Sequence, residues 1–173
     1  GLAQAIGEII GAELSASGVD FSFAPVLDLA FGPSSVIGDR AFSDDPEVAA
    51  RLAIAFMKGC LAAGVLPVGK HFPGHGDTSC DSHEELPVVP APRGTLLSRE
   101  LLPFRRAVRA GIPALMTAHV TYPALDPGAH RVPRLDEVPG IRLGLAHAQD
   151  TALVSPIRIQ HDHFHVLPGA ATL

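Results

Sequence analysis

A helical run followed by a short apolar run occurs three times in the first 119 residues of this 173-residue chain. The short apolar runs cover residues 21–27, 65–69 and 112–116. Apolar runs of this length, bounded by glycine or polar residues, are typical of strands that are buried on both faces. Short links between each helix and the next strand favour parallel strands joined by right-handed crossovers. The order of elements therefore predicts an α/β fold.

The predicted helices have recognisable ends. They cover residues 3–16, 45–63 and 97–110, and a glycine follows each of them within two residues, as is common after a helix end. The second helix has the clearest start. Asp45 can accept hydrogen bonds from the first turn, Pro46 needs no N–H there, and Glu47 lies near the positive end of the helix dipole.

Polar side chains follow each predicted strand. Asp28 ends the first strand, Lys70 and His71 follow the second, and His119 comes shortly after the third. In (β/α)8 barrels the functional side chains lie at this carboxyl end of the strands. A complete barrel needs roughly 250 residues. We therefore expect residues 1–128 to form a partial TIM (β/α)8 barrel of about three βα units.

Residues 129–173 show neither helical nor strand periodicity, and they hold five of the nine histidines. Prolines at positions 133, 139, 156 and 168 interrupt any helix long enough to pack. The histidines at 161, 163 and 165 lack the framework of a metal site and are typical of a solvated run. We predict an irregular tail without a function, which cannot supply further barrel strands. A truncation, a frame shift or an incomplete sequence would each produce such a tail.

The overall composition excludes several kinds of partner. The formal net charge is −5, so the chain has no basic stripe of the kind that neutralises nucleic-acid phosphates. Two cysteines, Cys60 and Cys80, do not suggest a disulfide framework. No apolar run approaches the ~18 residues of a membrane-spanning helix. We expect neither a nucleic-acid partner nor a membrane partner.

The segment after the second predicted strand carries the densest chemistry. Residues 69–83 hold three histidines, one lysine, two aspartates and three glycines. Such a density of polar groups after a buried strand indicates a functional loop. Glycines allow the backbone to approach a ligand, and Lys70 and His71 can donate hydrogen bonds to sugar hydroxyls. Asp81 and His83 are close enough for the carboxylate to orient the imidazole, as in a general acid and base.

These residues resemble a known family. The run Lys70–Asp77, followed by Asp81-Ser82-His83, is similar to the signature of the β-N-acetylglucosaminidases of glycoside hydrolase family 3, the muropeptide-recycling type. Residues 23–28, 38–42 and 117–120 are similar to the flanking segments of that family, in the same order. The resemblance covers residues 1–127.

The resemblance implies a fold, an activity and roles. It implies a barrel enzyme that hydrolyses terminal non-reducing N-acetyl-β-D-hexosamine by a retaining mechanism. His83 would be the acid/base and Asp81 its partner, in place of the usual second carboxylate. Arg40, Lys70 and His71 would bind the N-acetylhexosamine next to the scissile bond. The resemblance also implies a glycan or muropeptide substrate, a cytoplasmic location, and no cofactor or metal.

The nucleophile of that family is missing from its expected place. The resemblance places a catalytic aspartate in a Ser-Asp-Asp segment beyond the strand that ends near His119, and no such segment occurs in the sequence. Asp126, Asp136 and Asp150 stand in other contexts. We therefore expect this chain to be inactive alone.

Two other interpretations remain open. The first is a metal-dependent hydrolase that uses His71, His75, Asp77 and His83. Its weakness is that Pro73 and Gly74 break the spacing between the first two histidines, whereas a helix would hold both on one face. The second interpretation is a sugar-binding fragment without turnover, which would use the same site.

Overall fold

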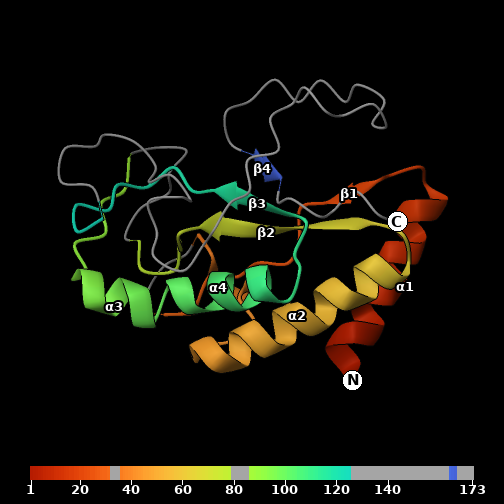
Figure 1. Cartoon of the computed structure of the whole chain (residues 1–173), viewed down its shortest axis with the longest axis horizontal. Helices are drawn as coiled ribbons and strands as arrows, with labels where there is room; N and C mark the ends of the chain where they lie inside the picture. The colour runs from red at the N-terminus through yellow and green to blue at the C-terminus, as the bar shows by residue number, and fades with distance from the viewer. Residues whose placement is uncertain (32–35, 79–85, 126–163, 167–173) are drawn as a thin grey trace.

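The structure is a computed structural model of the whole chain, and it describes residues 1–31, 36–78, 86–125 and 164–166. The helices are α1 (Leu2–Ala16), α2 (Pro46–Ala62), α3 (Arg93–Ser98) and α4 (Leu101–Arg109), with a 3-10 turn η1 (Gly38–Arg40). The strands are β1 (Phe21–Ser22), β2 (Leu66–Phe72), β3 (Ala114–Thr117) and β4 (Phe164–Val166). Figure 1 shows the helices below the sheet, with α1 beside α2.

The sheet has the order β1-β2-β3-β4. β1 pairs with β2 and β2 with β3, both in parallel; Val68 lies opposite Ala114 and Lys70 opposite Met116. Parallel strands that alternate with helices confirm the α/β class predicted from the order of elements. The carboxyl ends of β1, β2 and β3 therefore lie at one edge, where the polar residues that follow the strands can meet.

The first strand is shorter than predicted, because regular pairing covers only residues 21–22 of the expected 21–27. Pro25 has no N–H to donate to the ladder, which interrupts a regular strand. The chain nevertheless stays beside β2: the N–H of Lys70 donates to the carbonyl of Pro25 at 3.1 Å, and that of Leu27 to the carbonyl of Lys70 at 2.6 Å. Asp28 is thus still delivered to the end of β2.

The third predicted helix is two helices in the structure. α3 ends at Ser98 and α4 begins at Leu101, so the break falls at Arg99 and Glu100. Pro103 explains part of this break, because it has no N–H for the carbonyl four residues earlier. The second predicted helix is confirmed with its cap: the Asp45 carboxylate accepts from the N–H groups of Glu47 at 2.8 Å and Val48 at 2.9 Å.

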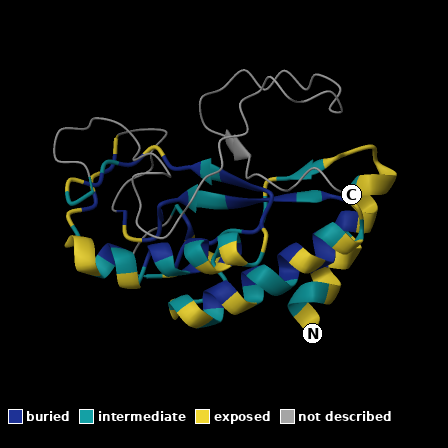
Figure 2. Ribbon diagram, viewed as in Figure 1, coloured by how far each residue is buried: buried dark blue, intermediate teal, exposed yellow. Residues whose placement is uncertain are grey.

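Two buried clusters hold the fold together, and Figure 2 shows the buried sides of α2 and α4 turned toward the sheet. The main cluster consists of Leu27, Ala53, Met57, Phe72, Leu101, Phe104, Ala107, Ile112 and Leu115. A second cluster lies beyond the ends of the strands and consists of Val89, Leu96, Ala118, Val120 and Tyr122. The second cluster supports the edge that carries the polar residues.

α1 packs closely on α2 through glycines. A Cβ on Gly7 would overlap the backbone carbonyl of Phe56, and one on Gly59 would overlap that of Gln4. Only glycine allows the two helix backbones to approach this closely.

The tail contributes one strand that the sequence does not predict. β4 pairs antiparallel with β3, with His165 opposite Leu115. Backbone pairing to an open strand edge needs no long apolar period, so no sequence pattern predicts this strand. Its antiparallel direction differs from that of a barrel strand. Within the described ranges, no helix is long and apolar enough to cross a membrane.

Candidate active site

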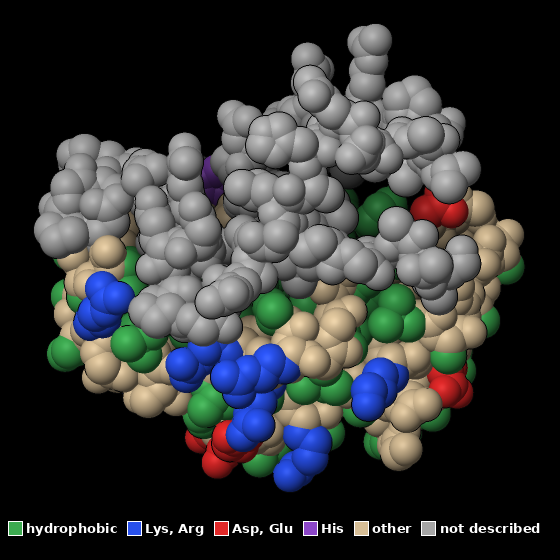
Figure 3. Space-filling view, viewed as in Figure 1, with side chains coloured by type: hydrophobic (Ala, Val, Ile, Leu, Met, Phe, Trp, Pro, Cys, Tyr) green, Lys and Arg blue, Asp and Glu red, His purple; other side chains and the backbone are tan. Residues whose placement is uncertain are grey.

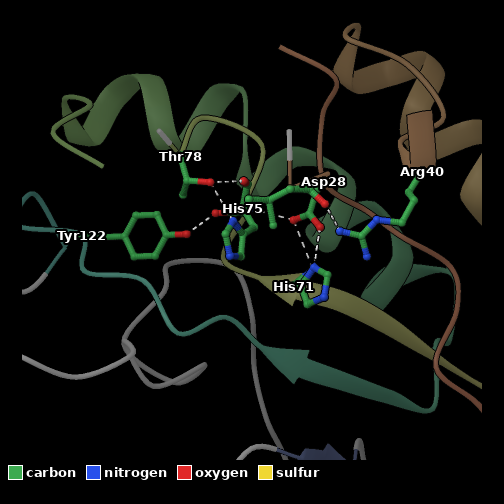
Figure 4. Close-up of polar contacts among 8 residues, drawn as sticks. Asp28, Arg40, His71, His75, Thr78 and Tyr122 are labelled. Atoms are coloured by element: carbon green, nitrogen blue, oxygen red, sulfur yellow. Dashed lines mark hydrogen bonds and ion pairs between the residues drawn. The ribbon is translucent and has the colours of Figure 1, made fainter. Parts of the chain in front are cut away.

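Three of the polar residues that the sequence places after the strands, Asp28, Lys70 and His71, lie together at the carboxyl edge of the sheet. Figure 4 shows Asp28 beside the ring of His71, with Arg40 on one side of this pair and His75 on the other. Lys70 and His71 lie near the carboxyl end of β2, because this strand extends to Phe72 rather than ending at Gly69. Asp28 lies at the end of residues 23–28, which follow β1, and Arg40 lies in η1.

The Asp28 carboxylate is the centre of this arrangement. The residue is only 1% exposed. Its Oδ1 accepts the backbone N–H of His75 at 2.7 Å and that of His71 at 3.1 Å. Its Oδ2 lies 2.7 Å from Nδ1 of the His71 ring and 3.1 Å from the same backbone nitrogen. One buried carboxylate therefore fixes both the end of β2 and the beginning of the following loop.

His75 is buried and bonded to the same loop. Its Nδ1 lies 2.8 Å from Oγ1 of Thr78, whose hydroxyl donates to the backbone carbonyl of His75 at 2.9 Å. Because the single hydroxyl hydrogen is used on that carbonyl, the ring Nδ1 is the donor in the other contact. The rings of His71 and His75 meet edge to face, with centroids 5.7 Å apart.

The loop after β2 is packed too tightly for side chains at two of its glycines. Gly74 has a φ of +131°, and a Cβ there would lie 2.9 Å from Cβ of Glu100. A Cβ on Gly76 would overlap the backbone carbonyl of Leu29. The Tyr122 hydroxyl donates to the carbonyl of Gly74. Burial, with the charges of Asp28 and Glu100, raises the pKa of Tyr122 well above its usual range, so this donor keeps its hydrogen.

Lys70 and Arg40 bring positive charge to the same edge. Burial lowers the pKa of the Lys70 ammonium, the nearby Arg40 guanidinium lowers it further, and Asp28 acts in the opposite direction. The Arg40 guanidinium also donates to the carbonyl of Val36. The structure therefore brings Arg40, Lys70 and His71 together, the three residues that the resemblance assigns to sugar binding.

A second polar network, which was not predicted from the sequence, contacts the loop after β2 at Asp77. The Arg99 guanidinium donates to Asp77 Oδ2 at 2.6 Å and to Glu100 Oε1 at 2.6 Å. It also lies over the ring of Phe31, 4.2 Å from the centroid. Glu100 is buried, and its Oε2 has no hydrogen-bond partner among the described residues. Adjacent Arg and Glu residues inside a predicted helix normally indicate a solvent-exposed face. The sequence therefore does not predict that Arg99 and Glu100, at the break between α3 and α4, contact the loop after β2.

The expected acid/base pair lies outside the described residues. Asp81 and His83 both fall in the range 79–85, which the structure does not describe. Their assignment as acid/base and partner stays a prediction. His119, expected at the same edge after β3, is exposed.

The metal interpretation gains no support from the described part of the chain. There, no group of three or more histidine, cysteine, aspartate or glutamate side chains could hold a metal ion. Asp77 is paired with Arg99. The fourth proposed ligand, His83, lies outside the described residues.

A different hollow lies on the helix side of the molecule. It has a volume of about 430 Å³ and is lined by Gln4, Glu47, Ala50, Arg51, Ile54, Ala55, Lys58 and Arg106. Figure 3 shows basic side chains gathered over the helices in the lower part of the view. Part of this charge is neutralised, because Arg106 pairs with Glu47 at 2.7 Å. None of the predicted site residues lines this hollow.

Comparison with known proteins identifies the family. The glycosyl hydrolase family 3 N-terminal domain matches residues 1–136. The chain belongs to this family. It is 52% identical over 125 residues to a protein named Beta-hexosaminidase from Thiobacillus denitrificans, and the match covers 72% of the chain and 35% of that protein. A Beta-hexosaminidase from Thioalkalivibrio sulfidiphilus is 55% identical over 126 residues, with 73% and 36% covered.

Solved structures of the family have the same fold. NagZ from Neisseria gonorrhoeae, in complex with N-trifluoroacetyl-D-glucosamine, matches with a TM-score of 0.69 and 48% identity over 72% of this chain and 36% of NagZ. A family 3 β-N-acetylglucosaminidase from Paenibacillus matches with a TM-score of 0.75 and 44% identity over 80% of this chain and 27% of that protein. This family 3 chain therefore spans about a third of its curated relatives, in agreement with a partial barrel.

Proposed function

We propose that this family 3 chain carries the sugar-binding part of a retaining β-N-acetylhexosaminidase, which hydrolyses terminal non-reducing N-acetyl-β-D-hexosamine residues. The observation that carries the proposal is the meeting of Arg40, Lys70 and His71 around the buried Asp28. Further support comes from the 52% identity over 125 residues with a protein named Beta-hexosaminidase. The substrate would be an N-acetylhexosamine glycan or a muropeptide, and the location the cytoplasm.

Arg40, Lys70 and His71 would bind the sugar next to the scissile bond. The Arg40 guanidinium and the Lys70 ammonium are hydrogen-bond donors only, and they suit hydroxyl and acetamido oxygens. Burial of Lys70 makes its ammonium harder to hydrate, so a ligand oxygen that replaces water is favoured. His71 is held by Asp28 and can hydrogen bond to a hydroxyl through its other ring nitrogen.

The chemical steps need two groups beyond this set. His83, oriented by Asp81, would protonate the leaving oxygen and later remove a proton from the attacking water. A carboxylate must attack the anomeric carbon in the first step. The sequence has no Ser-Asp-Asp segment in the expected place, so residues 1–128 would bind the sugar without turnover, and the tail at 129–173 would add no catalytic group.

Activity tests this proposal most directly in a chimera. Residues 1–125 of this chain would replace the matching segment of the Thiobacillus denitrificans Beta-hexosaminidase. We expect the chimera to hydrolyse aryl N-acetyl-β-glucosaminides and the 173-residue chain alone to hydrolyse none. An inactive but folded chimera would count against the proposal.

His83→Ala in the chimera tests the acid/base assignment. We expect a rate loss of about 10²–10⁴-fold with a poor leaving group and a much smaller loss with a good one, which needs little protonation. Asp81→Ala should act in the same direction. Equal losses for both kinds of leaving group would contradict the role of His83.

A further inference from the structure

The strongest unassigned feature is the Asp28 carboxylate, which lies at the site but cannot reach a ligand. Its side chain has no exposed surface, whereas that of His71 is 19% exposed. Three nitrogens of His71 and His75 contact its two oxygens, and the backbone N–H of His71 is shared between both. Any effect of Asp28 on a ligand must therefore pass through the residues it holds.

The contact with the imidazole decides which ring nitrogen of His71 carries hydrogen. As an ionised carboxylate, Asp28 can only accept, so the hydrogen in the 2.7 Å contact lies on Nδ1. A neutral imidazole has a single N–H, which leaves Nε2 with a free lone pair. Figure 4 shows the second ring nitrogen of His71 directed away from Asp28.

We propose that Asp28 is a positioning residue that holds neutral His71 in the Nδ1–H form and so presents Nε2 as a hydrogen-bond acceptor for a sugar hydroxyl. The identity of the ligand rests on the proposed function, whereas the ring form does not. Lys70 and Arg40 have only donors to offer. A sugar hydroxyl also donates a hydrogen bond, and Nε2 of His71 supplies the acceptor. This role differs from the donor role that the sequence suggested for His71.

Asp28→Asn gives a sharp test, because it changes one carboxylate oxygen into an amide donor without changing shape. The amide oxygen can take the place of Oδ1 and keep the N–H groups of His71 and His75. The NH2 group then faces Nδ1 of the His71 ring and donates to it. A neutral ring must move its hydrogen to Nε2, which turns the acceptor into a donor.

The measurement is ¹⁵N NMR of the imidazole nitrogens in the full 173-residue chain, at a pH where His71 is neutral. His71→Gln assigns the signals. We expect a protonated Nδ1 in the unaltered chain and a protonated Nε2 in Asp28→Asn. Asp20→Asn is the matched control, since Asp20 is exposed and directly precedes β1. This variant should leave the ring form of His71 unchanged.

Two results would overturn the proposal: a protonated Nε2 in the unaltered chain, or an unchanged ring form in a folded Asp28→Asn variant. If that variant does not fold, the spectrum of the unaltered chain still decides the ring form. Titration with the methyl β-glycoside of N-acetylglucosamine then tests the acceptor role. We expect the glycoside to shift the Nε2 signal, and Asp28→Asn to weaken binding about tenfold, as for one lost hydrogen bond.

The two proposals fail differently. If the unaltered chain has the Nδ1–H form but does not bind the glycoside, the proposed function fails and the acceptor role falls with it, while the ring form stands. If the glycoside binds but Asp28→Asn reverses the ring form with no loss of affinity, the proposed function stands and the acceptor role is wrong.

Discussion

The α1–α2 contact and the edge of β2 both depend on glycines where a Cβ would overlap a backbone carbonyl. In the helix contact, represented by Gly7 and Gly59, the backbone groups of both helices are already satisfied by their own helices. At the edge of β2, represented by Gly76, the backbone N–H groups of His71 and His75 are satisfied by the buried Asp28. Close packing alone therefore determines the first region, whereas the second also depends on one buried carboxylate.

The largest expected effect comes from removing the acceptor oxygens of that carboxylate. Asp28→Ala leaves the N–H groups of His71 and His75 without their acceptor in a buried place. Each buried unsatisfied group costs about 1–3 kcal/mol, so we expect a loss of about 3 kcal/mol or more in the free energy of unfolding, measured by chemical denaturation. Asp28→Asn should lose much less, because it keeps the amide oxygen. Equal losses for the two variants would contradict this account, because they would show that an acceptor oxygen at this position is not enough to hold the edge.

The next effect isolates the steric region. Gly59→Ala would force α1 away from α2, because its Cβ overlaps the carbonyl of Gln4. Overpacking of this kind costs about 1–3 kcal/mol. The matched control is Gly94→Ala in α3, where nothing lies within 4 Å of the added Cβ. The control should be neutral or stabilising by a few tenths of a kcal/mol. Circular dichroism during thermal unfolding separates the two, and a stable Gly59→Ala would contradict the close helix contact.

A smaller effect tests the network below the loop. Arg99→Met removes the partly exposed ion pair with Asp77, worth about 0.2–1 kcal/mol, and leaves the buried Glu100 carboxylate without its partner. We expect a total loss of about 1–2 kcal/mol. Adding Glu100→Gln should recover part of it, since the unpaired charge is gone. Additive losses in this double-mutant cycle would show that the two residues do not interact.

The smallest effect is expected at the N-terminal cap of α2. Asp45→Ala removes the acceptor of the N–H groups of Glu47 and Val48, at a cost of about 1 kcal/mol. Asp45→Asn, which keeps a capping oxygen, should cost less. Sugar binding should be unchanged in both variants, and a change in affinity would link the cap to the site.

Local signals in the sequence predicted most of the fold. The cap at Asp45 depends on neighbouring residues only, and it is confirmed together with the helix that follows it. Pro103 is a local signal for the break between α3 and α4 that the prediction did not use, whereas the burial of Glu100 there involves Gly74, which is distant in sequence. β4 escaped prediction for the same reason, since its partner β3 is about fifty residues away.

The sequence predicted which residues belong to the site, but it did not predict which of them contact one another. Lys70 and His71 were marked by their place after a buried strand, and the structure brings them together with Arg40. The ring contact of His71 with Asp28 crosses 43 positions of sequence, and the sequence alone could not show it. Asp81 and His83 remain predictions, because they lie outside the described residues.

The central claim is that the carboxyl edge of β2 binds N-acetylhexosamine. Backbone amide NMR of the 173-residue chain during titration with the methyl β-glycoside of N-acetylglucosamine tests it most directly. We predict shifts that centre on Arg40, Lys70, His71 and His75, and their loss in Lys70→Met. Shifts that centre instead on the hollow along α2, which Gln4 and Arg106 also line, or no shifts at all in the folded chain, would contradict the account.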